Sequence, residues 1–211
     1  MGTTLLIGSC EPFSGKSALV LGIAQQLIQS GLPFRFGKPL ATSLEWDPNK
    51  GPLPQPLIDD DVRFVGETLG LAADHLIPSL HLLSPTTATQ RLGHGQLDAG
   101  EGFDRLSAEV SASDGLTLLE CAGSLQEGLL FGLSLPQLAD GLDAKVVLVH
   151  LWQDSCSVDA LLSAKQSSTW PAEIRWNDGK SIVRTNLLRR SGSKVDSNGY
   201  EIASSRWKGG G

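Results

Sequence analysis

The sequence predicts an α/β fold in which helices cover both faces of a mostly parallel sheet. Short apolar segments, which fit buried strands, alternate along the chain with amphipathic segments, which fit helices joined by right-handed crossovers. The first apolar segment, residues 5–8, leads through a loop into a Gly-Lys-Ser sequence at positions 15–17, and an apolar-periodic segment follows from 18 to about 28. A chain of 211 residues is long enough for one sizeable core and too short for two ordinary domains.

The loop after the first strand indicates the P-loop NTPase type of this fold. Successive backbone N–H groups and a helix N-terminus form a concave site for phosphate oxygens. Gly15 lets the backbone approach a ligand closely, Lys16 can reach terminal phosphates, and the Ser17 hydroxyl can bind Mg²⁺. The common spacing places a glycine where Cys10 stands, and the nearest upstream glycine here is Gly8. A chance Gly-Lys-Ser in a surface turn is the alternative, but the flanking strand and helix favour a nucleotide site.

Composition and charge argue against several classes of protein. The net charge of −6 does not fit a general nucleic-acid footprint. Three widely spaced cysteines, an odd number, do not form a disulfide framework and fit a reducing compartment. The N-terminus begins directly with a strand pattern, and no apolar run approaches membrane-spanning length. We therefore expect a cytoplasmic protein that binds neither nucleic acid nor a membrane.

The second predicted strand places a lysine at the sheet edge that carries the phosphate loop. The first helix ends near Gly31, with Pro33 just beyond. The short strand Phe34–Phe36 then leads to Lys38, which stands before Pro39. Ligands of open parallel sheets bind at the carboxyl ends of the strands. Lys38 is therefore a candidate site residue, and a solvated surface charge is the alternative interpretation.

Three consecutive aspartates follow a proline-rich loop over residues 47–56. They are Asp59, Asp60 and Asp61, and a helical pattern continues over 62–69. An aspartate at a helix start caps the backbone and meets the positive end of the helix dipole. Three aspartates exceed what a cap requires, and oxygen ligands suit Mg²⁺. One of the three is thus a candidate metal ligand, and capping explains the cluster equally well.

The remaining segments continue the alternation. Residues 71–83 are apolar but interrupted by a proline, which predicts an irregular helix and loop. The four histidines lack metal-ligand spacing, and we interpret them as ordinary surface or core residues. The other predicted elements are helices over 101–112, 135–142 and 157–164 and strands over 116–119 and 145–149.

The strand over 116–119 ends in an acidic residue followed by small ones. Glu120 precedes Cys121-Ala122-Gly123-Ser124. A carboxylate at the end of a buried strand commonly holds Mg²⁺ or its bound water opposite a phosphate loop. Pairing of Glu120 with a nearby lysine is the structural alternative. Gly128 and Gly132 are expected to make the following loop mobile enough to cover a ligand.

Four of these segments together resemble the dethiobiotin synthetase-like group of P-loop proteins. They are residues 8–17, 37–39, 59–61 and 120–123. More closely, they are similar to the ATP-binding domain at the N-terminus of some phosphotransacetylase-family proteins, as in cyanobacteria. The loop of that domain is Gly-Ser-x-Glu-x-x-Ser-Gly-Lys-Ser, as it is here. The resemblance covers roughly Thr3 to Lys165.

The resemblance implies a site for ATP and Mg²⁺. It implies that Lys16 contacts the terminal phosphate and that Lys38 orients the reacting carbamate and phosphate. It also implies that Ser17, Asp61 and Glu120 arrange Mg²⁺. The synthetase itself has Glu-Gly-Ala-Gly-Gly where this chain has Glu-Cys-Ala-Gly-Ser. The residues expected to hold the nucleotide are Gly8, Glu11, Ser14, Gly15, Lys16, Ser17, Ala18 and Asn186.

The segment from Gln166 onward differs in character from the rest of the chain. It contains eight Lys and Arg against four Asp and Glu, is rich in serine and holds three of the five tryptophans. The resemblance implies a strand over 181–186 whose last residue, Asn186, reads the nucleotide base. The charge shift favours instead a divergent or frameshifted, partly disordered end. We therefore expect a P-loop domain over 1–165 and a divergent segment over 166–211.

Three functions remain open at this point. We favour a Mg²⁺-dependent ATP-binding domain, with or without hydrolysis, in an accessory or regulatory role of the phosphotransacetylase-associated type. The second is an ATP-dependent ligase that activates a carboxylate or carbamate of a small-molecule substrate, such as dethiobiotin synthetase or cobyrinic acid amide synthase. The third is a non-catalytic partner-binding module. If the chain forms a homodimer, the resemblance implies a site near the subunit interface.

Overall fold

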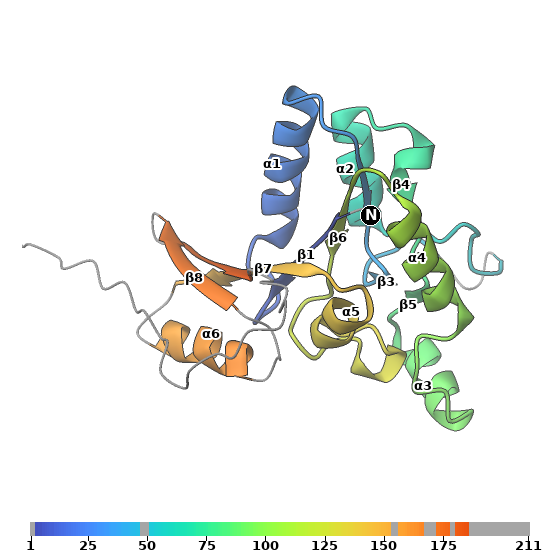
Figure 1. Cartoon of the computed structure of the whole chain (residues 1–211). Helices are drawn as coiled ribbons and strands as arrows, with labels where there is room; N and C mark the ends of the chain where they lie inside the picture. Colours follow the sequence, from blue (N-terminus) through green and yellow to red (C-terminus); the bar gives the residue numbers. More distant parts are fainter. Residues whose placement is uncertain (1–2, 47–50, 153–155, 167–171, 178–179, 186–211) are drawn as a thin grey trace, which may run out of the picture.

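The computed structural model describes residues 3–46, 51–152, 156–166, 172–177 and 180–185. In these segments seven strands form one sheet in the order β4-β2-β6-β1-β7-β9-β8 (Figure 1). Two short strands, β3 and β5, form a separate parallel pair. The strands are β1 (Thr3–Ser9), β2 (Phe34–Gly37), β3 (Leu40–Ala41), β4 (Leu76–Ile77), β5 (His81–Leu82), β6 (Leu116–Glu120), β7 (Lys145–Leu151), β8 (Ala172–Asn177) and β9 (Lys180–Thr185).

The helices occupy the connections between strands, as the alternating pattern predicts. The first helix begins at the lysine of the phosphate loop, two residues earlier than its apolar periodicity indicates. Residues 71–83 form a single 3₁₀ turn and two short strands. The helices are α1 (Lys16–Gln29), α2 (Asp60–Leu69), η2 (Ala73–His75), α3 (Pro85–Gly93), α4 (Glu101–Ala112), η3 (Leu129–Phe131), α5 (Leu135–Gly141) and α6 (Cys156–Gln166).

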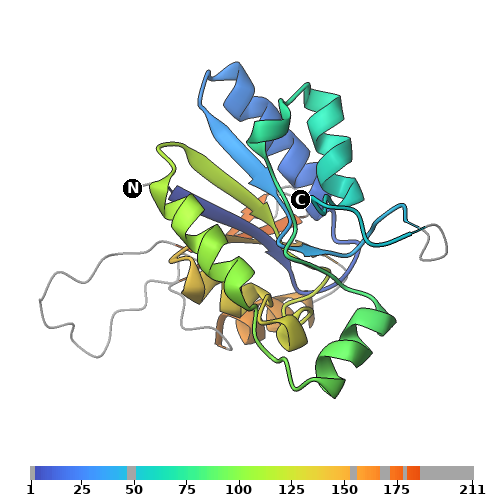
Figure 2. The ribbon, with the colours of Figure 1, turned by 90° about the vertical axis from the view of Figure 1, so that its right-hand side faces the viewer.

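Apolar side chains fill both faces of the sheet because its central strands are apolar at consecutive positions. In β1, Leu6 packs into the core layer that includes residues of α4, α5 and α6, while its neighbour Ile7 packs into the layer that includes α1 and α2. Leu119 and Leu118 of β6 divide between the two layers in the same way. Figure 2 shows α1 and α2 together on one face and α4 with α5 on the other. This is the predicted α/β fold.

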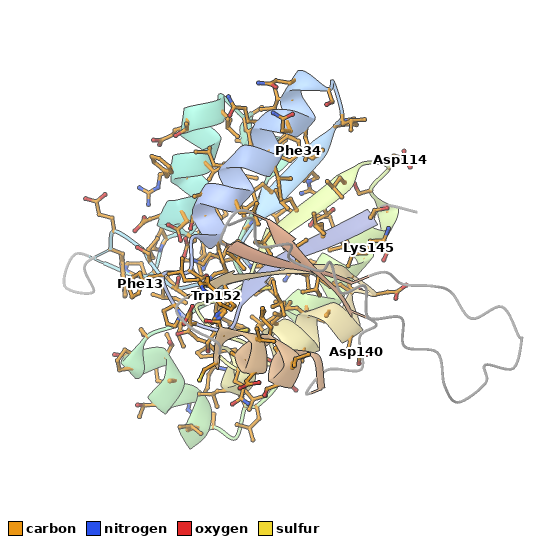
Figure 3. All side chains as sticks on the ribbon, turned by 90° about the vertical axis from the view of Figure 1, so that its left-hand side faces the viewer. Phe13, Phe34, Asp114, Asp140, Lys145 and Trp152 are labelled. Atoms are coloured by element: carbon orange, nitrogen blue, oxygen red, sulfur yellow. The ribbon has the colours of Figure 1, made fainter. Side chains whose placement is uncertain are left out.

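Five strands, from β4 to β7, run parallel, so their carboxyl ends share one edge of the sheet. Figure 3 shows this edge through Phe13 of the phosphate loop and Trp152 at the end of β7. Asp114 and Lys145, which precede or begin strands, lie at the opposite side of the same view. Placing the Gly-Lys-Ser loop between β1 and α1 at the carboxyl edge gives the P-loop NTPase fold.

The last two described strands depart from the parallel pattern. β9 pairs antiparallel with β7, with Leu151 opposite Lys180 and Val147 opposite Arg184, and β8 pairs antiparallel with β9. β9 therefore ends at the edge away from the phosphate loop, unlike the base-reading strand that the resemblance implies. Asn186 lies outside the described residues, as does most of segment 166–211, so the division at residue 165 stays a prediction. None of the helices in the described segments combines the length and apolar character needed to cross a bilayer.

Candidate functional site

The phosphate loop turns into α1 through a glycine in the left-handed conformation. Gly15 stands at the N-cap with φ +91°, where a side chain would be strained although the space around it is open. The first turn of α1 thus directs its free N–H groups toward the carboxyl edge of the sheet. Phe13, at the tip of the loop, also has a positive φ and is 96% exposed. The loop therefore has the backbone form that an anion-binding helix start requires.

Lys16 is buried and its ammonium contacts only neutral groups. Its Nζ donates to Ser9 Oγ at 2.8 Å and to the carbonyl of Gly123 at 3.4 Å. Lys16 is 8% exposed. Burial lowers the pKa of its ammonium, although the charges of Glu120 and Glu127 act in the opposite direction. Within the described residues no carboxylate forms an ion pair with it. An incoming anion would therefore supply the partner that this buried charge lacks.

Ser17 and Glu120 meet across the start of the loop because β1 and β6 are neighbours. Glu120 lies opposite Ile7 in the parallel register, and Ser17 Oγ donates to its Oε1 at 3.0 Å. Glu120 is 2% exposed, and its Oε2 is buried without a hydrogen-bond partner. Burial, together with the charge of Asp61, raises the pKa of Glu120 from 4.5 to about 7. The ionised form of Glu120 is therefore unfavourable in this buried position, and a bound cation would stabilise it.

These contacts test whether Mg²⁺ fits the site. Mg²⁺ in proteins usually binds one or two carboxylates together with water and substrate phosphates. The orphaned Oε2 of Glu120 and the Ser17 hydroxyl supply suitable oxygen ligands. Among the described residues, no three His, Cys, Asp or Glu side chains converge as a protein-only metal site would require. The donor set therefore fits a magnesium ion shared with a bound phosphate group.

Lys38 lies at the carboxyl end of β2, as its position before Pro39 predicts, but it is buried rather than solvated. Its Nζ contacts Asp61 Oδ2 at 2.7 Å and Asp59 Oδ1 at 3.3 Å. Burial alone would lower the pKa of Lys38, but the charge of Asp59 and the hydrogen bond that Lys38 donates to Asp61 outweigh it and raise that pKa. The protein thus neutralises this second lysine with its own carboxylates.

The three aspartates have three different roles. Asp59 caps α2 by accepting from the backbone N–H of Asp61 at 2.9 Å. Its other carboxylate oxygen accepts from the backbone of Thr42 and Ser43 at 2.7 and 3.0 Å. Asp60 turns outward to Arg63 and Ser43. Capping therefore explains Asp59, and only Asp61 is left to face the ligand site.

A cleft of about 560 Å³ joins these groups at the carboxyl edge of the sheet. Both lysines and the carboxylates of Asp61 and Glu120 line it. Ser14, whose buried hydroxyl has no hydrogen-bond partner, lines it as well. The full lining is Pro12, Phe13, Ser14, Gly15, Lys16, Ser17, Ala18, Lys38, Thr42, Ser43, Asp61, Glu120, Cys121, Gly123 and Glu127.

Two predicted nucleotide-binding residues have other contacts. A Cβ on Gly8 would overlap the side chain of Leu135, so this glycine allows α5 to pack on β1. Glu11 lies 3.0 Å from His150 Nδ1 and accepts from the backbone N–H of Leu151 at 3.2 Å. Glu11 therefore ties the phosphate loop to the end of β7. Neither residue lines the cleft, and their roles in binding a nucleotide stay predictions.

Glu127 is a cleft residue that the sequence does not single out. Its Oε2 accepts from the backbone N–H of Gly123, whose carbonyl accepts from Ser9 Oγ at 2.8 Å. Phe131, 1% exposed, anchors the same loop in the core. These contacts hold Gly123 and Glu127 at the wall of the cleft, and the following 3₁₀ turn is packed into the core. An acid in a glycine-flanked loop is visible in the sequence, but the direction of its side chain depends on that long-range packing.

Comparisons with known proteins identify no family for this chain. No protein-family model matches the chain, and no curated protein matches it. A structure of the signal recognition particle receptor FtsY from Elizabethkingia anophelis in complex with GDP is similar, with a TM-score of 0.44 and 15% sequence identity. The alignment covers 79% of this chain and 45% of the receptor, so the chain spans less than half of that protein. A likeness at this level does not extend to function.

Proposed function

We propose that the chain binds ATP with Mg²⁺ in this cleft, as a dethiobiotin synthetase-like ATP-binding domain of the phosphotransacetylase-associated type. The observation that supports it best is Lys16, a buried lysine at the start of α1 whose Nζ contacts only a hydroxyl and a carbonyl. A terminal phosphate would form an ion pair with the Lys16 ammonium. The free N–H groups of α1 would donate hydrogen bonds to the phosphate oxygens. The role of such a domain is accessory or regulatory.

Ser17 and Glu120 are the residues proposed to hold the metal. Ser17 and Glu120 both line the cleft beside the phosphate loop, and the Oε2 atom of Glu120 has no hydrogen-bond partner. Bound Mg²⁺ supplies positive charge that offsets the phosphates. Asp61 lines the cleft with its carboxylate paired to Lys38, and its role as a metal ligand stays a prediction.

The test is calorimetric titration of the full chain with ATP, with and without Mg²⁺, alongside Lys16→Ala. Removing a charge-assisted contact to phosphate should weaken binding about 10- to 100-fold. Lys145→Ala is the matched control, because Lys145 is exposed at the opposite edge of the sheet. Titration with GTP under the same conditions determines the base preference.

The proposal fails if the folded full chain binds no nucleoside triphosphate. It also fails if Lys16→Ala and Lys145→Ala bind equally well, because the ligand would then lie elsewhere. Circular dichroism of each variant separates loss of binding from loss of fold.

A second candidate function rests on Lys38. A second buried lysine lines the cleft together with Asp61, Thr42 and Ser43, beyond the phosphate loop. This arrangement favours a co-substrate beside the nucleotide, as an ATP-dependent carboxylate- or carbamate-activating ligase requires. Such a ligase predicts ATP hydrolysis that a diamine or its carbamate stimulates. Hydrolysis that no amine or carboxylate stimulates argues for the accessory domain.

A further inference from the structure

A second hollow, of about 210 Å³, lies beneath α3 and apart from the nucleotide cleft. It is formed by the segment before α2, by β5, by α3 and by Phe131 of η3. No residue that lines it also lines the cleft beside the phosphate loop. Whatever fills this hollow is therefore separate from the nucleotide.

The face of α3 that borders the hollow is polar. Thr87, Gln90, Arg91 and His94 line it, and they follow the i, i+3, i+4, i+7 spacing of one helical face. That stripe is normally apolar in a helix packed on its own protein. None of the residues of α3 is fully buried. Thr87 and Arg91 are half-buried and Gln90 and His94 are exposed, so the hollow opens to solvent along this polar face of α3.

The wall opposite α3 is apolar, so the two sides of the hollow differ in polarity. Small-molecule sites commonly combine apolar walls with a few convergent polar groups that fix orientation. A ligand with an apolar body and one polar end would match both walls at once. The apolar wall consists of Leu53, Leu57, Leu80 and Leu82.

Arg91 determines the charge of the polar end. Its guanidinium carbon lies 5.0 Å from the ring centroid of Phe131, and one Nη donates to the carbonyl of Asp98. Its Nε is buried without a hydrogen-bond partner. In the described part of the chain no carboxylate forms an ion pair with this guanidinium. A partly buried guanidinium held only by neutral groups favours an anionic ligand, and a carboxylate matches its geometry.

The other ionisable side chains that line the hollow are histidines, which are compatible with an anionic ligand. His81 and His94 line it, and no acidic side chain does. His81 Nε2 lies 3.1 Å from the carbonyl of Ala99. Burial and the charge of Arg91 lower the pKa of this imidazole and outweigh the hydrogen bond to Ala99 and the charge of Asp98, which raise it. His81 is therefore a neutral hydrogen-bonding group beside the arginine.

We propose that this hollow binds a small organic anion, a monocarboxylate with a short apolar chain. The carboxylate would pair with Arg91, and the chain would lie against the leucine wall. The volume corresponds to roughly seven water molecules, which fits a carboxylate of about four to six carbons. Such a ligand would anchor α3, which lacks a buried residue of its own.

Histidine ring signals in NMR spectra of the full chain test the proposal without any nucleotide. The chain has four histidines, of which His81 and His94 line the hollow. His75 belongs to η2 and His150 contacts Glu11, so these two are internal controls. Titration with sodium butyrate should shift the signals of His81 and His94 saturably and leave the other two unchanged. Butylamine, which has the same apolar chain and a positive charge, should give no saturable shift.

Two variants test separately the charge of Arg91 and the space inside the hollow. Arg91→Gln removes the guanidinium and should weaken butyrate binding about tenfold or more. Gln90→Trp fills the hollow from the exposed side of α3, keeps Arg91 and should abolish binding. Arg105→Gln, at an exposed position of α4, is the matched control and should bind as the unaltered chain does.

Several outcomes would overturn the proposal. Unsaturated drift of all four histidine signals, or equal shifts with butylamine, would mean that butyrate has no site here. Unchanged binding in Gln90→Trp would place the carboxylate elsewhere, and this variant decides the matter if Arg91→Gln does not fold. Because no nucleotide is present, failure here leaves the ATP proposal intact.

Discussion

Two buried lysines line one cleft, and their surroundings differ. Lys16, at the start of α1, contacts the Ser9 hydroxyl and the Gly123 carbonyl, both neutral. Lys38, at the end of β2, contacts the carboxylates of Asp59 and Asp61. The pKa of Lys16 is lowered and that of Lys38 is raised. Two buried lysines therefore have opposite pKa shifts, because only Lys38 has carboxylate partners.

The difference shows which positive charge is free to act on a ligand. A buried charge that the protein already pairs mainly maintains the fold, whereas one left with neutral partners favours an anionic ligand. Lys38 connects the end of β2 to the cap of α2 through Asp59. Lys16 connects only parts of the ligand site itself. We therefore expect the two lysines to contribute unequally to stability and binding.

Replacing each lysine by methionine should give the largest contrast. Lys38→Met leaves Asp59, fully buried, without its ion-pair partner, which should lower the free energy of unfolding by about 3–5 kcal/mol. Lys16→Met removes a buried charge that lacks a carboxylate partner, so its stability should stay within about 1 kcal/mol of the original. Urea unfolding at neutral pH measures both, and Lys145→Met is an exposed control. Equal losses for the two variants would contradict the distinction.

Glu120→Gln should stabilise the nucleotide-free protein and weaken its Mg²⁺-dependent binding. Burial raises the pKa of Glu120 from 4.5 to about 7, so the folded state favours the protonated acid. That preference stabilises the fold fully below about pH 4.5 and is lost as the pH rises through about 7. At about pH 8 the ionised acid costs on the order of 3 kcal/mol, which the amide avoids.

Urea unfolding of both proteins between about pH 4.5 and pH 8 checks this expectation. The gain from Glu120→Gln should grow with pH and disappear at the acidic end. Glu67→Gln, at an exposed position of α2, should show no such trend. A gain that is independent of pH would mean that packing, and not the buried charge, is responsible.

The phosphate-loop half of the site could be predicted because it is contiguous in the sequence. Residues 14–18, which line the cleft, are the end of the loop after β1 and the first turn of α1. The same local pattern predicted the central strands and most helices of the α/β fold. It did not predict α3 or the strands β3, β4, β5 and β8. Glu120 followed from its place at the end of a buried strand. Each of these features depends on spacing along the chain.

The half of the site around Lys38 could not be predicted from the sequence. Lys38, residues 42–43 and the aspartates before α2 come together there only in the folded chain. The roles of the aspartates depend on the path of residues 42–43, whose backbone N–H groups bind Asp59. Gly8 matches the family spelling, yet the packing of α5 fully explains it. The antiparallel direction of β9 also depends on pairing with β7 and not on local pattern. Sequence shows which residues are candidates, and packing decides which of them face a ligand.

Asp61→Asn should have the smallest effect and sharpens the assignment of the metal ligand. The Asp61 side chain is 40% exposed, so loss of its pairing with Lys38 should cost less than about 1 kcal/mol in stability. Because Lys38 holds its carboxylate, the Mg²⁺-dependent affinity for ATP should fall less than about threefold. Calorimetric titration beside Asp104→Asn, a control at an exposed position of α4, measures the change. A tenfold or greater loss confined to Asp61→Asn would instead make Asp61 a direct ligand, and Asp59 would then be the remaining carboxylate partner of Lys38.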